Sequence, residues 1–151
     1  MSYNSENILS NVKEALNNLE IQYKELPLKN DTYYFENGNF LKTEFAIKFK
    51  YKNKVYNLFF YFAKEITSLN KRNRYIWILR NNIKPDPDFE DFNLWFPKIV
   101  QSVKRKHERI WWIFVQENPL SKDIKRKFSN VPDNIRVFDL ENLDDKIKKH
   151  L

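Results

Sequence analysis

Lysines that recur at alternate positions are the side chains of this sequence best suited to binding an anion. Between residues 41 and 52, apolar residues alternate with Lys42, Lys48 and Lys50, a pattern typical of a β-strand with one cationic face. Like charges on one face repel each other, so a bound phosphate backbone would stabilise them. We therefore predict a nucleic-acid contact made by this lysine face and the basic residues of the following turns: Lys42, Lys48, Lys50, Lys52, Lys54, Lys71, Arg72 and Arg74.

The net charge of +7 is concentrated in one part of the chain. Residues 42–80 hold ten lysines and arginines and two acidic residues, whereas the rest holds 17 basic and 18 acidic residues. Such an excess favours an anionic partner. A solvated face remains the alternative interpretation, because edge lysines also prevent aggregation. The 20 lysines and 19 asparagines, against seven arginines, also fit a general compositional bias.

Composition argues against several other kinds of site. The chain has no cysteine, two histidines (His107 and His150) and one glycine, Gly38. It therefore lacks thiolate zinc sites, disulfides and a glycine-rich phosphate loop, and a serine–histidine–acid triad is not expected. The acidic run at 86–91 fits a divalent-metal site or acids that precede a helix, and we favour the helix. We predict no metal, no cofactor and no catalytic residues.

The length and apolar content indicate one packed domain, residues 1–151. Apolar residues make up 42% of the chain and aromatic residues 17%, which is typical of a globular protein. The longest apolar runs, 58–63 and 110–115, are too short to cross a bilayer. The N-terminus lacks the basic and apolar regions of a secretory signal. We expect a cytoplasmic protein without membrane contact.

The elements that would position the lysine face are strands in the first half of the chain. Residues 5–21 have the spacing of an amphipathic helix. Asn37-Gly38 is a strong hairpin signal, since both residues of a two-residue turn need positive φ. Strand-forming residues flank that turn and continue through 41–51, 55–64 and 74–80. The short connections predict a four-stranded antiparallel meander.

The second half predicts helices that alternate with buried strands. An acidic loop precedes a helix that begins near Asn93 and ends with the basic residues 104–106, where cations complement the helix dipole. "RIWWIFV" is apolar on both faces, as in a covered parallel strand. A short helix capped by Ser121, the strand "NIRVFDL" and a closing helix follow. The predicted core is Phe45, Ile47, Phe49, Leu58, Phe60, Ile76, Ile78, Ile99, Val103, Ile113 and Val115.

The predicted fold class is thus mixed α/β: an N-terminal helix, the meander, then two parallel crossover strands with flanking helices. From residue 40 onward this order resembles the restriction-endonuclease-like superfamily, in particular its Mrr-type branch. The segments "RIWWIFVQENPLSKDIKRKF" and "IRVFDLENLDDKIKKHL" are similar to the last strand–helix–strand–helix of that branch. The resemblance implies a restriction-endonuclease-like fold.

The resemblance also implies a magnesium site, whose residues this chain does not supply. The family needs an Asp where Tyr56 and Asn57 stand, and a Glu/Asp/Gln-x-Lys pair where Ile78-Leu79-Arg80 stands. Ile78, Leu79 and Arg80 cannot bind magnesium, and neither Tyr56 nor Asn57 is the carboxylate that the family needs. The resemblance therefore implies the fold, whereas the residues argue against nuclease activity.

The sequence is compatible with three functions. The first is a nuclease-like protein that binds DNA or RNA through phosphate contacts and does not cut it. The second is a protein-interaction module, such as an inhibitor or immunity partner, that docks through the acidic loop or the lysine face. The third is a magnesium-dependent nuclease whose ligands have moved, for example to Glu44.

Overall fold

The protein is a mixed α/β structure with a five-stranded mixed sheet. The structure, a computed structural model, describes residues 5–70, 75–79, 86–89, 108–128 and 134–151. Side chains are described for residues 5–67, 108–128 and 134–151. Within these ranges there are three helices: α1 (Ser5–Asn18), α3 (Lys122–Lys127) and α4 (Leu143–Lys149).

The five-stranded sheet combines an antiparallel hairpin with two parallel strands. Its strands in spatial order are β1 (Lys24–Glu25), β4 (Phe45–Tyr51), β5 (Lys54–Ala63), β9 (Glu108–Gln116) and β10 (Ile135–Asp139). Strand β4 is antiparallel to β1 and β5, whereas β9 is parallel to both β5 and β10. The prediction of two parallel crossover strands is confirmed.

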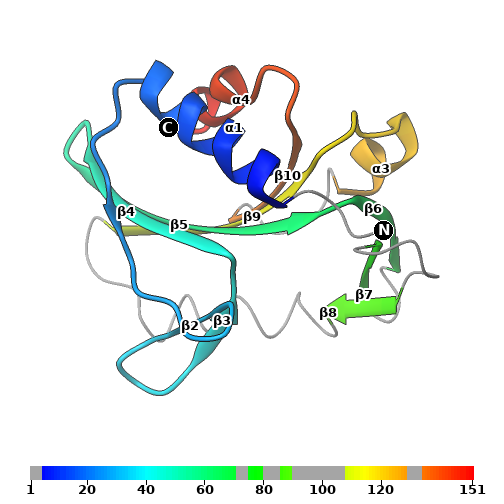
Figure 1. The fold of residues 1–151 in the computed structure, drawn as a ribbon, viewed down its shortest axis with the longest axis horizontal. Coiled ribbons are helices and arrows are strands. Elements are labelled where there is room, and N and C mark those ends of the chain that lie inside the picture. The colour runs from blue at the N-terminus through cyan, green and yellow to red at the C-terminus, as the bar shows by residue number, and fades with distance from the viewer. Residues whose placement is uncertain (1–4, 71–74, 80–85, 90–107, 129–133) are drawn as a thin grey trace.

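Helices α1 and α4 cover one face of this sheet, called here the upper face (Figure 1). Helix α1 follows the predicted amphipathic pattern and buries Ile8, Val12 and Leu16, although it ends at Asn18 rather than at residue 21. Seven residues of the predicted core are confirmed in this layer: Phe45, Ile47, Phe49, Leu58, Phe60, Ile113 and Val115. The side chains of Ile76, Ile78, Ile99 and Val103 lie outside the described residues.

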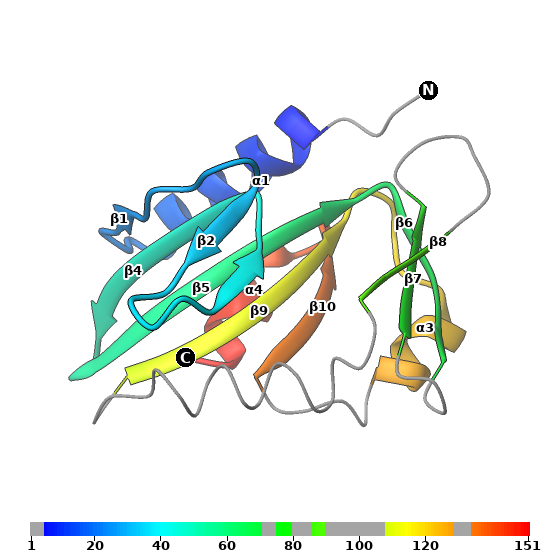
Figure 2. The same ribbon diagram turned by 90° about the horizontal axis from the view of Figure 1, so that it is seen from below.

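The lower face of the sheet carries a separate β-hairpin (Figure 2), and helix α3 contributes its apolar residues to the core cluster of that face. Ile124 and Phe128 pack there together with Trp112 and Phe59. Helix α3 begins as predicted, because the Ser121 hydroxyl accepts the N–H of Ile124 at 3.1 Å. Trp111 and Trp112 point to opposite faces and both are buried, so these two tryptophans belong to the core.

The prediction of a four-stranded antiparallel meander is wrong, because the predicted strands belong to three different sheets. Strands β2 (Thr32–Tyr34) and β3 (Phe40–Lys42) form a two-stranded sheet. Strands β6 (Glu65–Asn70), β7 (Tyr75–Leu79) and β8 (Asp86–Phe89) form another. Part of the predicted acidic loop is therefore strand β8, and the helix predicted from Asn93 lies outside the described residues.

A break at Thr43-Glu44 separates the two sheets that share residues 40–51. Thr43 is fully buried, and its hydroxyl donates to the Phe60 carbonyl at 2.9 Å. The N–H of Thr43 donates to Asp31 in the hairpin, whereas that of Glu44 donates to Phe60 in β5. Successive amides thus bond to different sheets, so the alternation does not run unbroken from Lys42 to Lys50.

The β2–β3 hairpin turns at the predicted place with a different geometry. The Gly38 N–H donates to the Phe35 carbonyl, and the Phe35 N–H donates to the Asn39 carbonyl. The loop therefore has three residues, and within it only Gly38 (φ 88°) has positive φ. This corresponds to a turn followed by a left-handed residue, the common three-residue hairpin connection.

Candidate nucleic-acid interface

The structure separates the eight residues of the predicted contact. Lys50, Lys52 and Lys54 gather at the end of the β4–β5 hairpin, and all three are exposed. Lys48 lies nearby, whereas Lys42 lies on the β2–β3 hairpin. Lys71, Arg72 and Arg74 lie outside the described residues. We call Lys50, Lys52 and Lys54 the basic tip.

A two-residue turn holds the basic tip together. Lys52 and Asn53 have φ values of 48° and 66°, which suits the right-handed twist of the two strands. In the ladder Lys50 is opposite Val55, and Tyr51 is opposite Lys54. Since opposed residues share a face, Lys50 points below the sheet and Lys54 above it. The three lysines therefore surround the end of the hairpin.

Lys48 is engaged in an ion pair. Its ammonium lies 3.1 Å from the carboxylate of Glu108, which reaches across strand β5 from β9. The Lys48 side chain is 41% exposed and the Glu108 side chain only 14%. Lys48 thus compensates a largely buried carboxylate, a role that the sequence interpretation missed.

A pocket of about 540 Å³ opens beside the basic tip, where strands β5, β9 and β10 begin. We call it the basic pocket. Its cationic side chains are Lys54, Arg109 and Arg136, and its acidic side chain is Glu108. It is lined by Lys54, Tyr56, Glu108, Arg109, Ile110, Trp111, Asn134, Arg136, His150 and Leu151.

Aromatic rings contact Arg136 and His150 in this pocket. The Arg136 guanidinium lies 5.6 Å from the centre of the Trp111 ring, within the range of cation–π attraction. The His150 ring meets Trp111 edge-on at 6.0 Å and stacks on Phe138 at 5.9 Å. Burial lowers the pKa of His150, and the positive charges of Arg136 and Lys149 lower it further. The imidazole is therefore neutral near pH 7, and the charge of the pocket comes from lysine and arginine.

Tyr56 is part of the pocket wall rather than a surface for stacking. Its side chain is 2% exposed, and its hydroxyl donates to the Leu151 carbonyl at 3.1 Å. Burial raises the pKa of this hydroxyl, although Arg109 acts in the opposite direction. Asn57, the next residue, donates its amide to the Arg109 carbonyl. Both positions where the resemblance places a catalytic Asp are thus engaged in structural contacts.

The remaining features bearing on catalysis are equally structural. Ile78 and Leu79 belong to β7, in a different sheet from β5, and Arg80 lies outside the described residues. The Glu44 carboxylate accepts the N–H of Phe62 at 3.0 Å. Among the described residues, no three histidine, cysteine or acidic side chains gather as a metal site would require.

The sequence interpretation missed a buried acid at the opposite end of the sheet. Asp139, at the end of β10, is 1% exposed and accepts the N–H groups of Leu120 and Glu141. Lys146 of α4 donates to the same carboxylate at 2.5 Å. Burial alone would raise the pKa of Asp139, but these donors outweigh it and hold the pKa below its usual value. The sequence signal for this buried acid was the position of Asp139 directly after the apolar residues of "IRVFDL".

Two arginines of the basic pocket were also missed. Arg109 and Arg136 each occur near the start of an apolar strand, and neither belongs to a run of basic residues within its strand. The parallel pairing of β9 with β10 places both arginines in the wall of one pocket. A single cation at the start of each of two predicted parallel strands was the only signal.

Comparisons with protein-family models, curated proteins and solved structures found no match. In the part of the chain that the structure describes, none of the helices has the length and apolar character needed to span a membrane.

Proposed function

We propose that the protein binds nucleic acid, and does not cut it, through the basic tip and the adjoining basic pocket. One observation carries this proposal: three exposed lysines gather at the hairpin end, and one of them, Lys54, also lines a pocket that contains two arginines and whose acidic side chain is paired with Lys48. Among the described residues, no acidic side chain lies within ion-pair distance of Lys50, Lys52 or Lys54. Their charge is thus available to an anion.

The arrangement of these cations favours a polymer over a small ligand. Lys50 and Lys54 point to opposite faces, and Lys52 lies between them in the turn. A phosphate backbone passing around the hairpin end would contact all three, whereas one phosphate group would not. Contacts of this kind give affinity with little sequence preference.

The absence of cleavage is proposed on the residues that occupy the expected catalytic positions. Tyr56 and Asn57 stand where the resemblance requires a metal-binding Asp, and their side chains make structural contacts. We further infer that the fold is a variant of the restriction-endonuclease-like fold. In its support, the antiparallel β4–β5 hairpin is followed by two parallel crossovers, β5 to β9 and β9 to β10.

Titration of labelled DNA and RNA over a range of salt concentrations tests the proposal. Each neutralised phosphate contributes about 0.7–0.9 to the slope of log affinity against log salt. The three lysines of the basic tip should therefore give a slope of about −2 or steeper. Replacement of Lys50 and Lys54 by Gln should reduce the slope by about 1.5.

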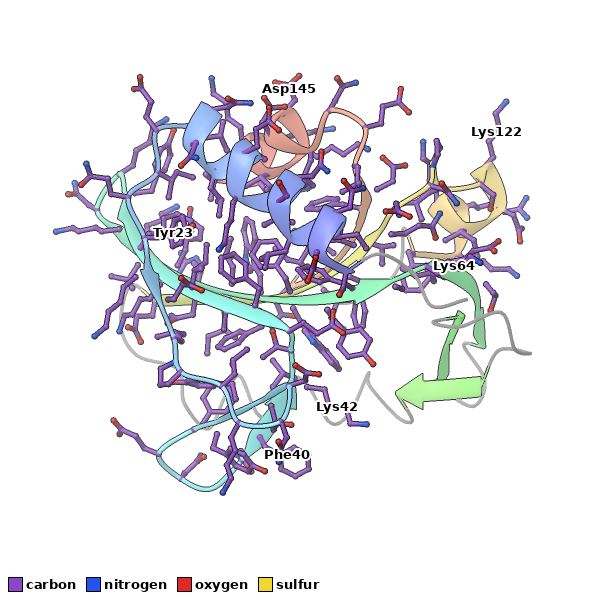
Figure 3. The ribbon with its side chains drawn as sticks, in the orientation of Figure 1. Tyr23, Phe40, Lys42, Lys64, Lys122 and Asp145 are labelled. Carbon is purple, nitrogen blue, oxygen red and sulfur yellow. The ribbon has the colours of Figure 1, made fainter. Side chains whose placement is uncertain are left out.

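Lys122→Gln with Lys125→Gln is the matched control. It removes the same charge from exposed positions of α3, at the other end of the sheet (Figures 1 and 3). This variant should keep the wild-type slope. The proposal fails if wild type binds neither DNA nor RNA at low salt, or if both variants behave alike. Magnesium-dependent cleavage that Glu44→Ala abolishes would support a nuclease with moved ligands instead.

A further inference from the structure

The β2–β3 hairpin lies below the lower face of the main sheet (Figures 1 and 2). Its two sides differ in their chemistry. On the inner side, Leu41 is fully buried and the Tyr33 ring lies 5.1 Å from Phe59. On the outer side, Tyr34 is 57% exposed and Phe40 is 47% exposed. These are the two exposed large hydrophobic side chains of the described residues.

The two exposed rings form a cross-strand pair with a lysine beside it. Tyr34 is directly opposite Phe40, and Thr32 is opposite Lys42, so these four residues share the outer side. The ring centres of Tyr34 and Phe40 are 6.1 Å apart, with the planes tilted by 43°. Figure 3 shows Phe40 and Lys42 projecting from the hairpin away from helix α1. We call Tyr34, Phe40 and Lys42 the outer hairpin face.

The base of this hairpin is fixed, so its rings are held in position before any ligand binds. The indole N–H of Trp112, a fully buried residue of β9, donates to the Lys42 carbonyl at 3.0 Å. The Thr43 N–H donates to the Asp31 carbonyl at the same end. A rigid platform loses little conformational entropy when a flat ligand stacks on it.

We propose that the outer hairpin face stacks on unpaired bases of single-stranded nucleic acid, with Lys42 beside the backbone phosphate. This inference rests on the proposed function and adds a substrate class to it. Exposed aromatic rings stack on any base, whereas the base faces of a duplex are already stacked on one another. The presence of Lys42 on the same face favours this ligand over an apolar protein segment.

The spacing of the rings suits two neighbouring stacking platforms. A base inserted between two parallel rings needs a separation of about 6.8 Å, twice the base-stacking distance of about 3.4 Å. The observed 6.1 Å with a 43° tilt is too close and too inclined for that arrangement. Each ring would therefore contact a base of its own.

Stacking and phosphate contact predict different responses to mutation. Lys42 is the cation of the outer hairpin face, and substitution of the two rings leaves it in place. Removal of the rings should weaken binding at every salt concentration while the slope stays unchanged. Removal of charge from the basic tip should instead change the slope.

The experiment compares binding of labelled oligothymidine and of a duplex by wild type and by Tyr34→Ala with Phe40→Ala. Loss of stacking reduces affinity about 5- to 150-fold per base. We expect the double variant to lose at least roughly 20-fold for the single strand, with little change for the duplex. The control, Tyr34→Phe with Phe40→Tyr, keeps both rings and should bind like wild type.

A fluorescence measurement gives an independent readout of stacking. Tryptophan introduced by Phe40→Trp should be quenched by oligothymidine more strongly than the tryptophans of wild type, and circular dichroism verifies that each variant is folded. Unchanged single-strand affinity of the folded double alanine variant overturns the inference. If Lys50→Gln with Lys54→Gln still flattens the salt slope in that case, the proposed function stands without it. No binding of either nucleic acid by wild type overturns both.

Discussion

The ammonium of Lys48 and the carboxylate of Glu108 lie 3.1 Å apart across strand β5, although the two residues are 60 positions apart in the chain. This pair joins β4 to β9, strands that are not neighbours in the sheet. It also removes one lysine from the surface available to an anion. The pair therefore distinguishes lysines that serve the fold from lysines that are free to bind.

Replacement of Lys48 by Gln should affect stability more than nucleic-acid binding. It leaves Glu108, whose side chain is only 14% exposed, without its ammonium. Because Lys48 itself is 41% exposed, we expect a loss of only about 0.5–1 kcal/mol in the free energy of unfolding, measured in urea. Lys50→Gln is the control, with a change within about 0.5 kcal/mol. A smaller salt slope for Lys48→Gln than for Lys50→Gln would contradict this assignment.

Asp139→Asn should destabilise the protein strongly. The amide cannot carry the charge that pairs with Lys146, and it brings a donor close to the N–H groups of Leu120 and Glu141. Removal of one partner of a buried ion pair typically costs about 3 kcal/mol or more. Thermal and urea unfolding measure the loss, and Asp123→Asn, at an exposed position of α3, should show little change.

The same carboxylate should make stability depend on acid pH. Because the folded-state pKa of Asp139 is lowered, the stability it contributes is complete above the unfolded value of 3.8 and is lost as pH falls through the folded value. The free energy of unfolding, measured from pH 5 downward, should therefore decrease more steeply for wild type than for Asp139→Asn. Parallel curves for the two proteins would contradict this assignment.

His150 should make the stability of the protein depend on pH in a second range, at and below pH 6.5. Burial, Arg136 and Lys149 lower its pKa below 6.5 in the folded protein, so the unfolded chain binds more protons in that range. Stability should fall as pH decreases from 6.5 through the folded value. His150→Gln should remove that step in an unfolding series, and a pKa of His150 above 6.5 by NMR titration would disprove it.

Gly38→Ala should destabilise the β2–β3 hairpin. Among the described residues, no atom beyond the adjoining residues of the chain lies within 4 Å of an added Cβ, so the effect comes from the backbone, whose φ of +88° is unfavourable for alanine. We expect a loss of about 1–2 kcal/mol in the free energy of unfolding. Asn tolerates positive φ better, so Gly38→Asn should lose less. Equal stability of wild type and Gly38→Ala would show that the loop rearranges.

Local pattern was enough to predict much of the fold. The alternation of Phe45, Ile47 and Phe49 predicted the buried face of β4, and apolar residues on both sides of β9 predicted a covered central strand. Both features depend on neighbouring residues alone. The break at Thr43-Glu44 could not be predicted in this way. Leu41, Thr43 and Phe45 keep the alternation of the strand pattern, although Leu41 belongs to the β2–β3 hairpin and Phe45 to the main sheet.

The candidate site was less predictable, because its members come from distant parts of the chain. Lys42 matched the spacing of Lys48 and Lys50, yet the break places it on the hairpin. Neither the partner of Lys48 nor the presence of Arg109 and Arg136 in one pocket follows from spacing, since both depend on the parallel pairing of β5, β9 and β10. Exposure of Tyr34 and Phe40 likewise depends on which side of the hairpin meets Phe59.

Strand β5 imposes an order on folding. Its pairing with β4 closes through a two-residue turn, whereas its pairing with β9 joins residues as far apart as Leu58 and Trp111, 53 positions along the chain. Closing so long a loop is entropically costly and slow, so the β4–β5 hairpin should form first and pair with β9 later. During that interval one edge of β5, from Leu58 to Ala63, is an apolar strand without a partner. Nascent chains are therefore expected to be most prone to self-association before residues 108–116 have emerged from the ribosome.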